Sequence, residues 1–234
     1  GHKAAKLMKR AKVTEARQQA VIAEKKTLLR NVDEADGLKL HPLAWGKSGP
    51  LVRAEGLSLS YGGRTVCAGL TFTLRPGERM AVTGPNGCGK STLLKKLCGQ
   101  DVAACGTLAL GAGLIVSYVP QDASFLHGGA RDYARNAGVD ETMFLTLLRK
   151  LGFERVQFEK DMADYSAGQK KKVLLARSLC ESAHLYLWDE PLNYIDVLSR
   201  MQIEQLLLDY RPTMLFVEHD AAFVRRAATG TLVL

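Results

Sequence analysis

The chain has 234 residues, of which 47% are hydrophobic and 24% are charged, with a net charge of +8. This balance excludes a disordered or fibrous chain and predicts a globular domain with an adequate apolar core. No secretory signal pattern is present, and the longest charge-free apolar region, TLALGAGLIVSYVPQ, is interrupted and is shorter than the ~20 residues of a membrane span. The five cysteines form no C-x-x-C pair. We therefore expect a cytoplasmic chain that does not itself cross a membrane.

The positive charge is concentrated at the start of the chain. Residues 1–30 hold nine Lys or Arg and two Glu, a charge of +7, which leaves +1 for the other 204 residues. The segment 4–30 lacks Gly and Pro, so it predicts a polar, basic helix, followed by a connector over residues 31–50. Such a helix projects into solvent, pairs with a helix outside this chain or lies on a polyanion.

The rest of the chain alternates between strands and helices. Residues 51–61 and 69–74 predict antiparallel strands, and 79–84 predicts a short apolar strand that runs into a glycine loop. A helix follows over 90–99, then strands over 107–111 and 115–121, and helical pieces between 130 and 160. Buried strands are expected over 183–190, 212–220 and 230–234, with helices over 197–210 and 221–228. The pattern predicts an α/β fold with a parallel sheet and an antiparallel part.

The motif GPNGCGKS, residues 84–91, fits the phosphate-binding loop pattern between a strand and a helix. Its glycines let backbone N–H groups point at an anion, and the helix N-terminus adds positive potential. In this pattern Lys90 reaches the β- and γ-phosphates, the Ser91 hydroxyl ligates Mg²⁺ and Thr92 binds the α-phosphate.

Acidic residues after a second apolar strand complete the expected chemistry. Asp189 and Glu190 end LYLWDE, where Asp189 supplies a second Mg²⁺ ligand and Glu190 polarises the attacking water. His219 follows another apolar strand, and sequence order alone does not assign it a role.

Seven motifs in order resemble the nucleotide-binding domain of an ABC ATPase over residues 51–234. They are LSYGG, the phosphate loop, VPQD, YSAGQ, WDEP, NYID and EHD. The resemblance implies the P-loop fold of that family, with a mixed core sheet, an antiparallel β subdomain and a helical signature subdomain near residues 125–180.

The resemblance also assigns roles to residues. Tyr61 would stack on adenine, Gln121 would sense Mg²⁺ and the attacking water, and Glu190 and His219 would be catalytic base and switch histidine. Asp196 and the signature residues would act in trans, on nucleotide held by an opposing domain. The implied nucleotide contacts are Tyr61, Gly84, Pro85, Asn86, Gly87, Cys88, Gly89, Lys90, Ser91 and Thr92, with Ser166, Ala167, Gly168, Gln169 and Asp196 in trans. The implied Mg²⁺ ligands are Ser91, Gln121 and Asp189.

A basic helix before the domain, with EHD at the switch, resembles the C-terminal half of an ABC-F protein. That resemblance implies two ABC domains on one chain, residues 1–30 as the end of an interdomain linker, and the ribosome, its RNA and tRNA as partners. The sequences SAGQ and DEPLNYID resemble the branch that protects ribosomes from antibiotics. The alternative is the ATP-binding subunit of a membrane transporter. Intact motif residues argue against a module with a dead ATP site.

The stretch SAGQKKK combines a capping box, Ser166 with Gln169, and three lysines, Lys170–Lys172. Positive charge is unfavourable at the start of a helix, so the lysines predict an exposed anion site with uncompensated charge. Val173, Ala176, Leu179 and Cys180 predict one buried face on the helix behind them. The sequence leaves open whether the lysines face nucleotide or RNA.

Overall fold

The computed structural model describes residues 38–234, which form one compact unit. The predicted basic helix and the first part of the connector fall on residues 1–37 and so lie outside the described residues. No helix within residues 38–234 is long and apolar enough to cross a membrane.

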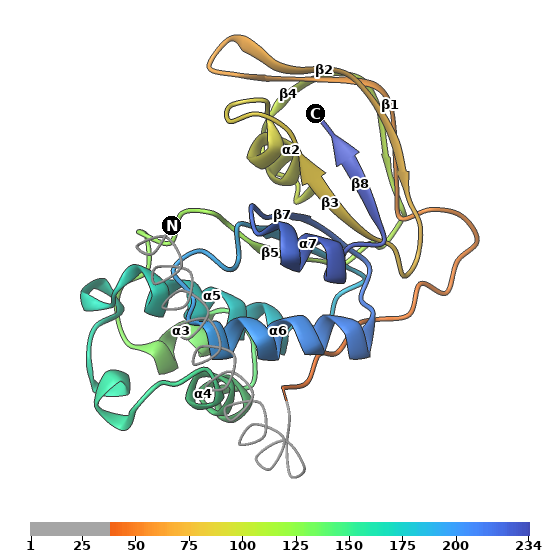
Figure 1. The fold of residues 1–234 in the computed structure, drawn as a ribbon. Helices are drawn as coiled ribbons and strands as arrows, with labels where there is room; N and C mark the ends of the chain where they lie inside the picture. Colours follow the sequence, from red (N-terminus) through yellow and green to blue (C-terminus); the bar gives the residue numbers. More distant parts are fainter. Residues whose placement is uncertain (1–37) are drawn as a thin grey trace, which may run out of the picture. The chain divides into compact units, whose positions relative to one another are not determined.

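Two sheets form the framework, as Figure 1 shows. The first is antiparallel, in the order β2-β1-β4, with β1 at Val52–Tyr61, β2 at Arg64–Leu74 and β4 at Ala103–Leu110. Gly62 and Gly63 join β1 to β2 with positive φ at both positions, the conformation that a tight hairpin requires. The sequence pattern had placed only the second half of β2.

The second sheet has five strands in the order β5-β6-β7-β3-β8, and every strand pairing in it is parallel. Its strands are β3 (Arg79–Thr83), β5 (Val116–Val119), β6 (Leu185–Asp189), β7 (Met214–Val217) and β8 (Gly230–Val233). The predicted α/β class, with a parallel core sheet and an antiparallel part, is confirmed. The mixed core sheet that the resemblance implied is not found, because every pairing among the described strands of the core sheet is parallel.

The helices cover both faces of the parallel sheet. In Figure 1, α2 lies on the side of the antiparallel sheet, whereas α5, α6 and α7 lie on the other side. The helices are α2 (Lys90–Leu97), α3 (Ala130–Asn136), α4 (Glu141–Lys150), α5 (Ala167–Cys180), α6 (Val197–Tyr210) and α7 (Ala221–Ala227), with short 3₁₀ helices η1 (Arg155–Glu159) and η2 (Met162–Asp164).

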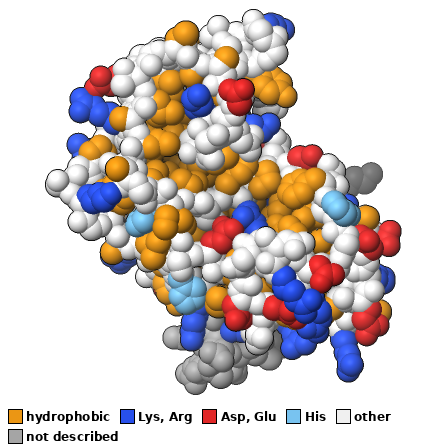
Figure 2. Space-filling model, turned by 180° about the vertical axis from the view of Figure 1, so that it is seen from behind, with side chains coloured by type: hydrophobic (Ala, Val, Ile, Leu, Met, Phe, Trp, Pro, Cys, Tyr) orange, Lys and Arg blue, Asp and Glu red, His pale blue; other side chains and the backbone are white. Residues whose placement is uncertain are grey.

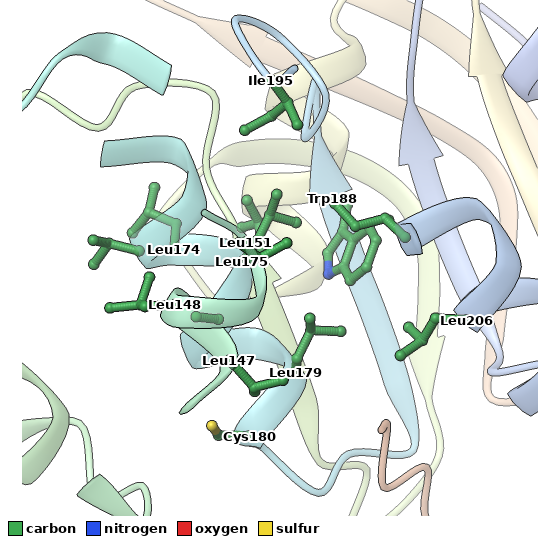
Figure 3. Packing of buried hydrophobic residues seen from close by; sticks show 14 of the residues in the cluster. Leu147, Leu148, Leu151, Leu174, Leu175, Leu179, Cys180, Trp188, Ile195 and Leu206 are labelled. Carbon is green, nitrogen blue, oxygen red and sulfur yellow. The ribbon is translucent and has the colours of Figure 1, made fainter. Parts of the chain in front are cut away.

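Alternation along the parallel strands creates two hydrophobic cores. In β6, Leu185 and Leu187 join the core shared with α2 and the antiparallel sheet, whereas Tyr186 and Trp188 join the core shared with the other helices. Successive side chains of a strand point to opposite faces, so a strand buried on both faces is apolar throughout. Figure 3 shows Trp188 on the side of the sheet that faces Leu179 of α5 and Leu206 of α6. The end of β6 is therefore held from both faces.

The described part of the connector is packed on the domain. Leu40 is buried, and the backbone N–H of Leu43 donates to the carbonyl of Ala183 at 2.8 Å. Trp45 meets His184 edge to face, with 5.3 Å between ring centroids. Residues 38–50 therefore belong to the same compact unit as the sheets.

Candidate active site

The phosphate loop connects β3 to α2, as its sequence context predicts. Gly84 and Gly89 have φ of 147° and 99°, values that L side chains rarely adopt. A Cβ on Gly84 would lie 2.6 Å from the carbonyl oxygen of Leu234, and one on Gly89 would lie 3.1 Å from Cγ2 of Val66. The Nζ of Lys90 donates to the carbonyls of Gly84 at 2.8 Å and Pro85 at 3.0 Å, across the loop.

The start of α2 is suited to an anion. Gly89 caps the helix without a side-chain hydrogen bond, and the first turn holds no acidic residue. Its backbone N–H groups are thus available to oxygen atoms of a ligand.

A cavity of about 540 Å³ opens beside this loop and gathers most of the predicted nucleotide residues. It is lined by Tyr61, Val66, Asn86, Gly87, Gly89, Lys90, Ser91, Thr92, Gln121, Glu190 and His219. Gly84, Pro85 and Cys88 belong to the same loop but are not among the lining residues. Val66 is an apolar contact that the motifs did not predict. None of Ser166–Gln169 lines the cavity, so the signature residues are not brought to the nucleotide side of their own domain.

Asp189 ends β6 and is completely buried. Neither of its carboxylate oxygens has a hydrogen bond of good geometry among the described residues. Burial raises the pKa of Asp189, and the nearby Ser91 hydroxyl opposes that shift. A buried carboxylate with open lone pairs beside a hydroxyl suits a hard cation, so Asp189 and Ser91 fit a magnesium site. Gln121, the third predicted ligand, lines the same cavity as Ser91.

Glu190 and His219 face each other at the ends of neighbouring strands. The His219 Nε2 lies 3.1 Å from Oε1 of Glu190, and Asn193 Nδ2 donates to Oε2 of Glu190 at 2.5 Å. Glu190 has φ of 48°, a left-handed conformation that costs a non-glycine residue energy and is frequent at functional sites. The backbone of Glu190 is thus strained, its carboxylate is held by His219 and Asn193, and the residue lines the cavity.

Glu218 organises the segment around these residues, and sequence reasoning missed it. Its carboxylate accepts from the backbone N–H groups of Leu192 and His219, each at 2.9 Å. The available signal was its place at the end of a buried strand, which is also the signal that identified Asp189.

Tyr61, the residue predicted to stack on adenine, stands at the end of β1 and is 64% exposed. Lys95 of α2 lies over one face of the ring, with its Nζ 5.7 Å from the ring centroid. The exposed ring therefore offers a flat apolar surface at the cavity.

The signature segment forms the capping box that its sequence predicts. Ser166 Oγ accepts from the N–H of Gln169 at 3.2 Å, and the Gln169 side chain accepts from the N–H of Ser166 at 2.9 Å. Gly168 leaves no room for a side chain, because a Cβ there would lie 2.4 Å from the carbonyl oxygen of Tyr194. Signature loop and NYID loop are thus in direct contact within one domain.

The prediction of an exposed site with uncompensated charge at Lys170–Lys172 is wrong for two of the three lysines. Lys171 is only 3% exposed, and Lys172 pairs with Asp196 at 2.6 Å between Nζ and Oδ2. The single buried face is also wrong, because Val173–Ala176 and Ser178–Cys180 are all buried. The helix α5 lies between the sheet and α4, so apolar atoms surround it (Figure 3).

Asp196, predicted to act in trans, uses its carboxylate within the domain. It caps α6 by accepting from Ser199 N at 2.9 Å, besides pairing with Lys172. Arg200 holds the preceding loop by donating to the carbonyls of Leu192 at 2.9 Å and Ile195 at 3.0 Å. The motifs gave no indication of this arginine.

Comparison with known proteins agrees with this geometry. Residues 67–193 match the family described as ABC transporter. The chain is 32% identical over 199 residues to the ATP-binding protein Uup of Caulobacter vibrioides, covering 81% of this chain and 33% of that protein. It is 30% identical over 188 residues to the ribosome protection protein VmlR of Bacillus subtilis, covering 78% of this chain and 34% of that protein. The chain therefore spans about a third of the length of these two relatives.

Other similar proteins have different names. The zinc import ATP-binding protein ZnuC of Ruegeria pomeroyi is 34% identical over 193 residues, with 79% of this chain and 75% of ZnuC covered. A solved structure described as the ATP-binding subunit of an ABC transporter aligns with a TM-score of 0.63 at 25% identity, over 79% of this chain and 85% of that one.

Proposed function

Since the chain belongs to the ABC transporter family of ATP-binding domains, we propose that it is the C-terminal ABC domain of an ABC-F protein that acts on the ribosome. Domains of this family bind ATP, generally hydrolyse it and act with a second ABC domain. The proposed role is protection of the ribosome from antibiotics or modulation of translation.

The cavity residues suit in-line attack of water on the γ-phosphate. Glu190 accepts the proton of the attacking water, and His219, 3.1 Å from Oε1 of Glu190, orients that carboxylate. Lys90 and the loop amides absorb the negative charge that develops on the phosphate oxygens. Mg²⁺, held by Ser91, Asp189 and Gln121, would neutralise part of the charge on the β- and γ-phosphates.

The charge of residues 1–30 is the observation that carries the ribosome proposal. A segment of +7 before a domain of nearly balanced charge is suited to RNA phosphates, since clustered Lys and Arg release counterions on binding. The likeness to VmlR and Uup supports the same assignment, because both are about three times as long as the chain's match. That leaves room for a linker and a second ABC domain.

A transporter subunit is the second candidate. The match to ZnuC covers three quarters of that protein, so a chain of one ABC domain is compatible with the similarity. This candidate explains the ATP site equally well, but it gives the basic segment no role.

Ribosome co-sedimentation of the full-length protein tests the proposal. The Glu190→Gln variant is expected to bind ATP, to lose hydrolysis by roughly a hundredfold or more, and to sediment with ribosomes when ATP is present. Lys90→Ala is the matched control, since it removes the phosphate contact and should abolish the ATP-dependent sedimentation.

Salt provides the second arm of this experiment. Binding should weaken steeply as salt rises, and charge reversal at Lys6, Lys9, Arg10 and Lys12 should flatten that dependence. A variant that hydrolyses ATP poorly yet never associates with ribosomes, and that co-purifies with a membrane permease, would favour the transporter subunit instead.

A further inference from the structure

Lys171 is a buried cation whose partners are backbone carbonyls. Its side chain is 3% exposed, and its Nζ donates to the carbonyls of Pro120 at 2.8 Å, Gln121 at 3.0 Å and Asp189 at 3.2 Å. All three hydrogens of the ammonium therefore have an acceptor. No carboxylate forms a direct ion pair with it among the salt bridges of the described residues.

These carbonyls belong to the two segments that carry the chemistry. Pro120 and Gln121 begin the loop after β5, and Gln121 lines the cavity. Asp189 ends β6, and Glu190 follows it directly. Lys171 thus fixes the backbone beneath the candidate magnesium ligands and the candidate base without itself lining the cavity.

The same lysine stands two residues after the signature on α5. Ser166–Gln169 form the capped start of that helix, and a helix is stiff over so short a distance. Lys171 therefore links the Gln121 loop and the end of β6 to the helix that begins with the signature.

The electrostatic surroundings agree with this geometry. Burial lowers the pKa of Lys171, whereas the carboxylates of Asp189, Glu190, Glu218 and Asp122 favour its charged form. A buried ammonium is costly unless it is fully hydrogen-bonded, so the three carbonyls and the cation depend on one another.

We propose that Lys171 is a positioning residue that couples the domain's own ATP site to the signature helix it presents to an opposing domain. The proposal rests on the ATPase function given above and on the role of the signature in trans. It predicts that Lys171 affects turnover far more than nucleotide binding, because the side chain contacts neither phosphate nor base.

The test compares Lys171→Met with Lys160→Met in the full-length protein, without ribosomes. The Lys160 side chain is exposed and forms no hydrogen bond or ion pair with another described residue, so it is a control for the loss of a lysine outside the nucleotide cavity and the signature. Affinity is measured with a fluorescent ATP analogue, turnover as kcat and KM, and folding by thermal melting.

For Lys171→Met we expect an analogue Kd within about threefold of wild type and a kcat lowered at least about tenfold, because small misplacements of catalytic groups are costly. Lys160→Met should match wild type in both quantities. Hydrogen exchange should quicken in residues 120–124 and 189–190 and stay unchanged in β3 and β7.

A loss of affinity parallel to the loss of kcat, with a general fall in protection, would reduce Lys171 to a structural residue and overturn the proposal. If Lys171→Met does not fold, Lys171→Arg decides, since it keeps the charge and the donors but alters their geometry. A kcat defect with normal affinity in that variant supports the coupling, and wild-type kcat contradicts it. None of these measurements involves ribosomes. The test of Lys171 can therefore be interpreted even if the ribosome proposal fails.

Discussion

At the residue scale, close approaches decide which side chains the site tolerates. Gly168 faces the carbonyl oxygen of Tyr194, and Tyr194 itself has a positive φ of 62°. The contact joins the signature loop to the loop that leads to Asp196. The signature of this chain has Ala at position 167, where the helix has just begun and the side chain is exposed, but it keeps Gly at position 168.

Gly168→Ala should therefore destabilise the domain and lower ATP turnover. The new Cβ would lie 2.4 Å from a backbone oxygen, so the Tyr194 loop has to move. Overpacking of this kind costs about 1–3 kcal/mol, measurable as a lower urea midpoint at unchanged m-value. Gly46→Ala is the control, since no atom lies within 4 Å of its added Cβ. Equal stability of the two variants would contradict the proposed crowding.

At the element scale, one ion pair joins the helices that carry the signature and the NYID loop. Lys172 of α5 contacts Asp196, the N-cap of α6, and also donates to the carbonyl of Leu151 after α4. Three helices thus meet at one ammonium group. Burial would raise the pKa of Asp196, but hydrogen bonds from Lys172 and Ser199 outweigh it and lower that pKa to about 2.

The acid dependence of stability should reveal this pair. A carboxylate whose pKa is lowered by folding stabilises the protein above its unfolded pKa, and the contribution is lost as pH falls from 3.8 towards 2. The melting temperature of Asp196→Asn should therefore lie below that of wild type above pH 4, and the two should converge at lower pH.

The effect should be modest, at most about 1 kcal/mol, because the Asp196 side chain is 49% exposed and water screens the pair. Asn keeps the N-cap hydrogen bond, so the variant isolates the charge. Asp209→Asn, on the exposed side of α6, is the control. A difference in melting temperature that stays constant from pH 6 to pH 2.5 would argue against this pair as its source.

At the scale of the whole molecule, the residues that line the nucleotide cavity are separate from the signature residues. The cavity gathers the phosphate loop, Gln121, Glu190 and His219, but none of the signature residues. In the proposed function, the signature of an opposing domain completes this site. On the face in Figure 2, Lys and Arg side chains are interspersed with Asp and Glu.

The isolated chain should accordingly hydrolyse ATP slowly. If copies pair to complete the site, the specific activity should rise with protein concentration and follow the dimer fraction measured by light scattering. Full-length protein should show no such dependence. High turnover in a strictly monomeric sample would mean that one domain suffices.

Local patterns carried the sequence predictions that the structure confirms. Apolar runs predicted the strands of the parallel sheet. The motif GPNGCGKS predicted the phosphate loop because all of its residues are contiguous in the sequence. The errors have a common physical cause. Lys171 bonds the carbonyl of Gln121, 50 residues away along the chain, and Lys172 pairs with Asp196, 24 residues away. Local sequence therefore gives no indication that these charges have partners. Arg200 acts on loop backbone, for which side-chain patterns give no signal, whereas Glu218 shares with Asp189 a place at the end of a buried strand.

The packing of the two tryptophans allows intrinsic fluorescence to report on the site. Trp188 is completely buried, donates from Nε1 to Ser178 of α5 at 2.9 Å and immediately precedes Asp189. Trp45 lies near the start of the described residues, against His184. In a Trp45→Phe variant, the remaining emission comes from the strand that delivers the acidic residues. Nucleotide binding at the cavity would then be visible without a label.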